Sequence, residues 1–169
     1  MQKIGIKVDT SFLDGLKQKN SKHLLELSSK IHELSGGEFN INSPKQLGVV
    51  LFETLNLPTQ KKTKTGYSTN EAVLHKLFGK HDIIPALLKY REAFKLQSTY
   101  IEPLLELGLK DEKSSIYTSF LQTGTATGRL SSKDPNLQNI PVRSDSGRMI
   151  RQSFIAREGY TLVGIDYSQ

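Results

Sequence analysis

The sequence predicts an α+β fold, in which a helical unit is followed by the beginning of an α+β unit. Apolar residues recur at helical spacing through most of residues 1–110. Two later segments, 115–120 and 160–165, are rich in β-branched and aromatic residues and are expected to form strands, the second of them buried. Residues 131–147 between them are rich in Ser, Asn, Asp, Pro and Gly, so they are expected to be mostly loop.

Capping signals place the first two helices. Asp9 to Ser11 offer N-cap side chains, and Gly36-Gly37 is expected to end the helix that follows them. Ser43 stands before Pro44, which suits the first turn of a second helix, and Pro58 is expected to end that helix.

The next two helices have a capping signal of their own. Ser68, with Glu71 three residues later, matches a capping box and predicts a short helix. A longer helix is expected over residues 82–99, and Pro103 and Gly108 are expected to mark its end. From Gly147 the chain is expected to form one short helical turn.

Composition excludes several classes of protein. The chain has 169 residues, a formal charge of +6 and no cysteine, which rules out disulfides and thiolate zinc sites. No run approaches the roughly 18 apolar residues of a membrane span, and the start lacks a secretory signal. We therefore expect a cytoplasmic protein that does not enter membranes. Its basic balance suggests a polyanionic partner.

The basic excess is concentrated in the middle of the chain. Residues 61–110 hold nine basic and five acidic side chains, and the excess is centred on Lys61, Lys62 and Lys64. This stretch is expected to be a flexible tip between two helices. The local sequence leaves two interpretations open: a solvated polar loop, or a loop that touches phosphates.

The segment 160–165 is followed directly by Asp166. An acid at the end of an apolar strand is costly to bury unless it is paired or bound to a metal, although it can also simply begin a loop. A central strand needs neighbours on both sides, and few strand-like segments precede this one. We therefore expect the sequence to be cut within a larger fold.

Sequence blocks in the second half resemble the family A DNA polymerases, of the bacterial DNA polymerase I type. These are TATGRLSS at 125–132, DPNLQNIPVR at 134–143 and DYSQ at 166–169, the last resembling the opening of polymerase motif A. Upstream, Ile6 to Asp9 and the helix around Tyr90 to Tyr100 resemble parts of the family's thumb. The chain departs from the family pattern at Tyr117, where histidine is common, and at Gln97, where lysine is frequent.

The resemblance implies a helical thumb subdomain over residues 1–110 and the start of an antiparallel-sheet palm over 111–169, truncated within motif A. It implies a fragment of a DNA-directed DNA polymerase, an enzyme of replication and repair that transfers nucleotides by a two-metal mechanism. Asp166 would be a catalytic, metal-binding carboxylate, and the carbonyl of Tyr167 a further ligand of Mg²⁺, which prefers oxygen.

One carboxylate does not make a two-metal site, because two cations need more negative charge to hold them. We therefore expect weak or absent Mg²⁺ binding and no polymerisation by this chain alone. Deoxynucleoside triphosphates would bind only to the full-length parent enzyme, and the chain is expected to be a monomer.

The expected partner of the chain itself is primer–template duplex DNA. Phosphates would be held by the basic stretch around Lys61 to Lys64 and by Arg91 and Lys95, which share one helix face. Arg129 would reach the minor groove. Asn136, Gln138 and Asn139 have an alternative role, in which their amide side chains order the loop by hydrogen bonds to nearby backbone groups. Arg143 would lie near the primer–template or the triphosphate. The residues expected to bind DNA are Lys61, Lys62, Lys64, Arg91, Lys95, Arg129, Asn136, Gln138, Asn139 and Arg143.

Two other classes of function stay open at this point. One is a non-catalytic DNA-binding module, and the other is a structural helical protein whose basic loop is merely solvated. Salt-dependent duplex binding would favour the DNA-binding interpretations, and its absence at low salt would favour the structural one. The four histidines lack metal-ligand spacing, and no serine has a recognisable base partner.

Overall fold

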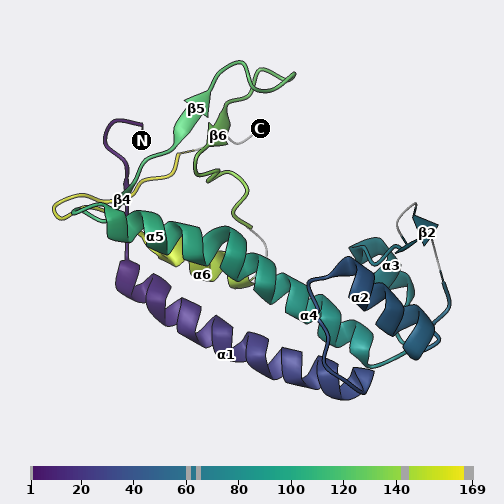
Figure 1. The fold of residues 1–169 in the computed structure, drawn as a ribbon. Helices are drawn as coiled ribbons and strands as arrows, with labels where there is room; N and C mark the ends of the chain where they lie inside the picture. The colour runs from purple at the N-terminus through teal and green to yellow at the C-terminus, as the bar shows by residue number, and fades with distance from the viewer. Residues whose placement is uncertain (1, 60–61, 64–65, 142–144, 166–169) are drawn as a thin grey trace. The chain divides into compact units, whose positions relative to one another are not determined.

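The computed structural model describes residues 2–59, 62–63, 66–141 and 145–165. It confirms an α+β fold, with long helices and small antiparallel sheets (Figure 1). The chain divides into two compact units: one is Asn20–Lys95, and the other joins Met1–Lys19 to Leu96–Gln169. These units do not follow the expected boundary at residue 110. That boundary between thumb and palm stays a prediction.

The first two helices begin as their capping signals predict. Helix α1 (Thr10–Ser35) follows Asp9, whose carboxylate accepts the Phe12 N–H at 2.8 Å. Helix α2 (Pro44–Val49) continues into a π-helical turn, η1 (Val50–Thr54). The residue with left-handed backbone after it is Asn56, at φ 50°. The helix therefore ends before Pro58, because Asn tolerates this conformation.

The expected flexible tip contains regular structure in its described part. Strand β2 (Lys62–Thr63) pairs antiparallel with β3 (Gly66–Tyr67), a pairing that the sequence did not predict, and the flexibility of the tip stays a prediction. Helix α3 (Glu71–Lys76) is capped by Asn70, whose side chain accepts the Val73 N–H at 2.9 Å. The capping box at Ser68 is therefore wrong, since Asn caps as well as Ser and stands nearer the helix.

The long helix does not end at Thr99. Helix α4 (Ile83–Leu96) passes through the π-helical turn η2 (Gln97–Ile101) into α5 (Glu102–Lys110). Pro103 lies in the first turn of α5, where a missing N–H costs little. Gly108 lies inside α5, and glycine is favoured at this position because a Cβ there would stand 2.7 Å from Val8 Cγ2. Both residues therefore lie within α5 and do not mark the end of the long helix.

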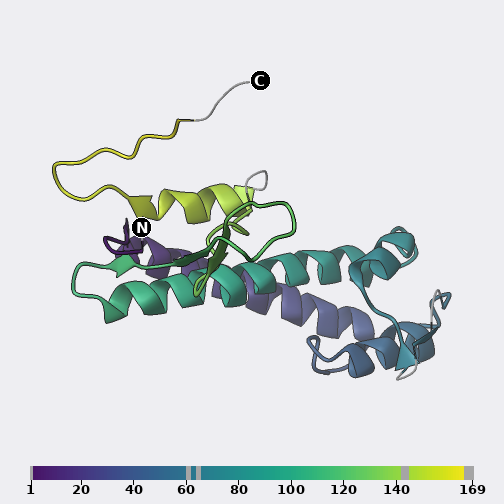
Figure 2. The same cartoon turned by 90° about the horizontal axis from the view of Figure 1, so that it is seen from above.

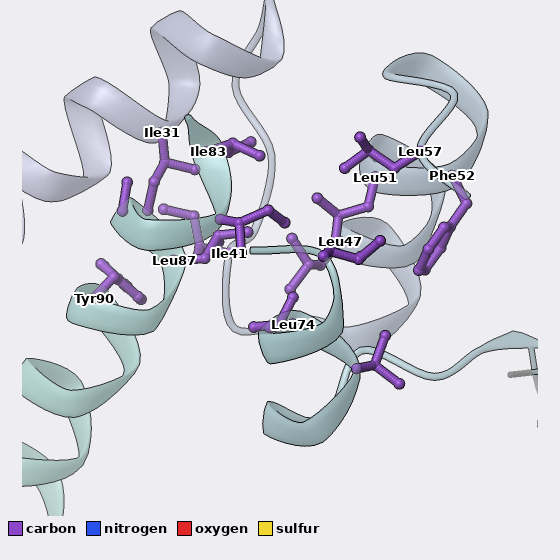
Figure 3. Close-up of a cluster of buried hydrophobic side chains, with 14 of the residues drawn as sticks. Ile31, Ile41, Leu47, Leu51, Phe52, Leu57, Leu74, Ile83, Leu87 and Tyr90 are labelled. Carbon is purple, nitrogen blue, oxygen red and sulfur yellow. The ribbon is translucent and has the colours of Figure 1, made fainter. Parts of the chain in front are cut away.

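Unit Asn20–Lys95 is built around an apolar core. Figure 3 shows Ile31 of α1, Leu74 of α3 and Leu87 of α4 among the buried side chains that meet there. All three are fully buried. Burying a side chain of this size contributes about 1.5–3 kcal/mol, so this core accounts for much of the stability of the unit. Further fully buried members are Leu47, Leu51, Leu77, Ile83 and Ile84.

The other unit contains a three-stranded antiparallel sheet. Strand β1 (Ile6–Val8) lies between β4 (Ser115–Ile116) and β7 (Phe154–Ile155). Helix α6 (Asp145–Gln152) extends the expected helical turn and precedes β7. A second apolar core joins the sheet and the helices, and its fully buried members include Leu13, Ile101, Ile116 and Ile150.

A separate two-stranded ribbon follows the sheet strand β4. Strand β5 (Ser119–Leu121) pairs antiparallel with β6 (Ser131–Lys133), with Phe120 opposite Ser132 (Figure 1). The β-prone segment 115–120 is therefore divided between two sheets. Most of the remaining residues up to Pro141 are irregular, as the sequence predicts.

The buried strand expected at 160–165 is absent. This segment follows β7 without regular structure (Figure 2), and Val163 and Ile165 are 75% and 91% exposed. A strand needs backbone partners and apolar cover. Among the described residues, no strand pairs with segment 160–165. In residues 2–59, 62–63, 66–141 and 145–165, no helix has the length and apolar character to cross a membrane.

Candidate nucleic-acid interface

Arg129 lies at the end of the loop that joins β5 to β6. A turn precedes it, in which the Gly128 N–H donates to the carbonyl of Thr125 at 3.4 Å. Gly128 has φ 73°, a left-handed conformation that favours glycine. The Arg129 side chain is exposed. The local sequence therefore places a cation on the surface at a defined point of the chain. We call residues 118–139 the arginine segment.

Two side chains hold the main chain at Arg129 and just after it. The Thr125 hydroxyl donates to the Arg129 carbonyl at 2.7 Å. The Gln138 amide donates to the Leu130 carbonyl at 3.0 Å, and its oxygen accepts the Ser132 N–H at 2.9 Å. The backbone at Arg129, Leu130 and Ser132 is thus fixed by three side-chain hydrogen bonds, one from the turn itself and two from Gln138.

A buried hydroxyl pair anchors the same segment. Thr118 Oγ1 and Ser132 Oγ are 2.7 Å apart and almost fully buried. Both hydroxyls lie within hydrogen-bond distance of the Pro135 carbonyl, at 2.7 and 3.1 Å. The Leu137 N–H donates to Ser132 Oγ at 3.1 Å. A satisfied buried polar network of this kind favours one conformation of the loop.

The other amides of the arginine segment serve the loop as well. Asn136 Oδ1 accepts the Gln138 N–H at 3.0 Å, and the Tyr100 hydroxyl donates to the Asn139 carbonyl at 2.6 Å. The loop-architecture alternative left open by the sequence therefore describes Asn136 and Gln138 in this structure. The Asn139 side chain is exposed. DNA contact by these amides stays a prediction.

Arg91 has a structural partner in the unit Asn20–Lys95. Its guanidinium donates to the Thr69 carbonyl at 2.5 Å and lies 3.4 Å from the Thr69 hydroxyl. Burial lowers the pKa of Arg91, and the nearby charge of Glu71 offsets part of that shift. Arg91 thus holds the chain just before α3. Lys95, four residues on, is exposed.

Several predicted site residues lie outside the described part of the chain: Lys61, Lys64, Arg143, Asp166 and Tyr167. For Lys62 only the backbone is described. The described candidates belong to two compact units, with Lys62, Arg91 and Lys95 in one and Arg129, Asn136, Gln138 and Asn139 in the other. Among the described residues, no group of three or more His, Cys, Asp or Glu side chains could hold a metal.

Sequence reasoning missed the residues that order the arginine segment. Thr118, Thr125 and Ser132 are short hydroxyl residues, and their partners are backbone groups up to 17 residues away. No periodic pattern marks such contacts. The one available signal was the preference of Ser, Thr, Asn and Gln in loops for bonds to nearby backbone.

Comparison with known proteins places the chain in a family. The model of DNA polymerase family A matches residues 10–169. DNA polymerase I of Bacillus subtilis is 52% identical over 170 residues, and that of Caldicellulosiruptor bescii is 49% identical over 169. Each alignment covers 100% of this chain and 19–20% of the relative.

A solved structure supports the same placement. The POL domain of Pol1 from M. smegmatis, in complex with DNA primer-template and dNTP, matches with a TM-score of 0.85 and 42% identity. The match covers 93% of this chain and 28% of that chain. The fold is thus that of part of a polymerase domain. The chain belongs to DNA polymerase family A, and it spans about a fifth of the length of the curated relatives named above.

Proposed function

We propose that this chain is a DNA-binding part of a DNA-directed DNA polymerase, acting in replication and repair. It contacts primer–template duplex DNA and contributes one metal-binding carboxylate to template-directed nucleotidyl transfer. The observation that carries the proposal is the arginine segment, in which an exposed arginine stands on a main chain fixed by side-chain hydrogen bonds. Membership of family A supports it.

Arg129 suits a contact that tests the shape of a base pair. The minor groove presents acceptors that differ little between base pairs, so a donor there binds without reading sequence. A fixed backbone lowers the entropy lost when the arginine is ordered on DNA. The exposed Asn139 amide suits a sugar or phosphate contact. Lys95 and the lysines Lys61, Lys62 and Lys64 would hold phosphates electrostatically, with Arg91 and Arg143 contributing charge nearby.

Family A DNA polymerases use divalent metal. In this chain the carboxylate of Asp166 and the carbonyl of Tyr167 would hold Mg²⁺, whose ligands are oxygens. When bound, the metal would lower the pKa of the primer hydroxyl and stabilise charge on pyrophosphate. One carboxylate cannot hold two cations, so this chain alone would not extend primers, and the triphosphate would bind to the complete enzyme. A monomeric state and a cytoplasmic location belong to the same proposal.

Duplex binding by the 169-residue chain tests the proposal. We expect a fluorescently labelled primer–template to bind at low salt, with Arg129→Ala weakening binding by about two- to tenfold, the worth of one hydrogen bond. Replacing Lys61, Lys62 and Lys64 with Ala should reduce the slope of log affinity against log salt by about 2–3, one for each lost phosphate contact. Lys19→Ala, an exposed lysine on α1, is the control for loss of charge alone.

Three results would contradict the proposal. Absence of duplex binding at low salt would favour a structural helical protein. Primer extension by the purified chain, abolished by Asp166→Ala, would show that the chain is itself a complete catalyst. Binding without extension in any longer form of the protein would favour a non-catalytic DNA-binding module.

A further inference from the structure

We propose that Thr125 and Gln138 are positioning residues for Arg129, a role that rests on the proposed contact of Arg129 with the minor groove. In this role Gln138 acts through the main chain and does not touch DNA itself. The two side chains form a clamp on the main chain at the arginine and just after it. The Thr125 hydroxyl holds the Arg129 carbonyl, and the Gln138 amide holds Leu130 and Ser132.

The Gln138 side chain is bonded to the loop at both ends of its amide. Its amide oxygen accepts from Ser132 and its amide nitrogen donates to Leu130, at 2.9 and 3.0 Å. These bonds use one of the two amide hydrogens and one of the two lone pairs of the oxygen, and they fix the orientation of the amide against the loop. A base-edge contact by Gln138 could use only the remaining hydrogen or lone pair in that fixed orientation. The geometry therefore favours an indirect role over the direct DNA contact that the sequence predicts for this residue.

The clamp is itself anchored to buried structure. The Gln138 N–H donates to Asn136 Oδ1, and the chain just before it is held by the buried Ser132 hydroxyl through the Leu137 N–H. Ser132 in turn meets the buried Thr118 hydroxyl at 2.7 Å. A displacement of Gln138 would therefore disturb several bonds at once. This coupling makes the position of the Arg129 backbone a property of the whole arginine segment.

Thr125 acts at the arginine itself. Its hydroxyl reaches across the turn to the Arg129 carbonyl, while its own carbonyl accepts the Gly128 N–H. Thr125 is only half-buried, so its hydroxyl can be removed without opening a core. It therefore offers a variant that changes the clamp and spares the fold.

The test compares two duplexes that differ in one minor-groove acceptor. The full chain is titrated with a primer–template ending in guanine and with the same duplex ending in 3-deazaguanine, which lacks the minor-groove nitrogen acceptor. We expect the wild type to bind the analogue about two- to tenfold more weakly, as for one lost hydrogen bond. In Thr125→Val and Gln138→Ala, the ratio of the affinities for the two duplexes should fall to about one, because Arg129 no longer reaches the acceptor. Thr125→Ser, which keeps the hydroxyl, should retain the wild-type ratio.

The matched control is Gln122→Ala, an exposed glutamine in the same loop, which should keep the wild-type ratio. A merely structural loss would weaken binding to both duplexes equally and leave the ratio unchanged. If circular dichroism shows that Gln138→Ala fails to fold, the Thr125→Val and Thr125→Ser pair decides. A wild-type ratio in Thr125→Val would overturn the clamp. A ratio of one in the wild type would instead overturn the minor-groove contact of Arg129, and the clamp with it.

Discussion

Two regions of the chain are held together by different forces. Helices α1 to α4 of the unit Asn20–Lys95 surround a core of fully buried leucines and isoleucines. The arginine segment has short strands, and its order comes from hydroxyl and amide bonds to backbone carbonyls and N–H groups. Apolar packing is non-directional, whereas hydrogen bonds fix orientation. A region that must present one side chain at one place is therefore built from directional bonds.

The largest expected effect is in the apolar region. Leu87 is fully buried in the core of Figure 3, and Leu87→Ala removes its contacts and leaves a cavity. We expect the free energy of unfolding to fall by about 2–5 kcal/mol, measured by urea denaturation. Leu25→Ala, at a 70% exposed position on α1, is the control and should change it little. Equal losses would show that this core does not stabilise the unit.

A smaller effect is expected in the polar region. Thr118→Val keeps the shape of the buried side chain and removes the donor to the Pro135 carbonyl. We expect a loss of about 1–3 kcal/mol, the cost of leaving a buried group without its hydrogen bond. Thr118→Ser keeps the hydroxyl and should lose less. If valine proves as stable as threonine by thermal unfolding, the hydroxyl pair does not order the segment.

A single N-cap hydrogen bond at the start of α3 is expected to contribute less than the buried hydroxyl pair. Asn70 accepts the Val73 N–H, so Asn70→Ala should cost about 1 kcal/mol. Asn70→Ser, which keeps an accepting oxygen, should cost much less. Circular dichroism during thermal unfolding measures both. Equal stability of Asn70→Ala and wild type would contradict the capping role of Asn70 and favour the cap that the sequence predicts at Ser68.

The smallest expected effect depends on pH. Hydrogen bonds from the backbone N–H of Ser115 and then of Lys113 lower the pKa of Asp111 below its ordinary value. Stability from a depressed folded-state pKa is present above the unfolded pKa, about 3.9 for aspartate, and is lost as the pH falls through the folded value. Wild type should therefore lose melting temperature more steeply than Asp111→Asn below about pH 4. Identical acid slopes, with Glu112→Gln as control, would contradict this.

The helices were largely predictable from the sequence. Apolar periodicity and the caps at Asp9 and Ser43 give α1 and α2 with their starts. The continuation through Pro103 was not predictable, because the π-helical turn that precedes it leaves no compositional mark. The strand expected at 160–165 failed for a different reason. Its apolar pattern is strand-like, but the described residues offer it no partner.

For the site, the sequence identified Arg129 but not what holds it. The resemblance of residues 125–143 to family A polymerases marked the arginine, and the comparisons confirm the family. Gln138 was assigned to DNA because amides suit DNA contacts, although the structure bonds both ends of its amide to the loop. Contacts between residues 6 to 17 apart in a loop have no period to reveal them.

Hydrogen–deuterium exchange of the full chain, with and without primer–template duplex, tests the central claim most directly. The claim is that the arginine segment contacts DNA, in addition to the lysines proposed to hold phosphates. Bound DNA should slow amide exchange within residues 125–139, because contact there adds to the bonds that already hold the segment. Exchange in α1 between residues 20 and 35 should stay unchanged. A bound duplex that leaves 125–139 unaffected would contradict the account.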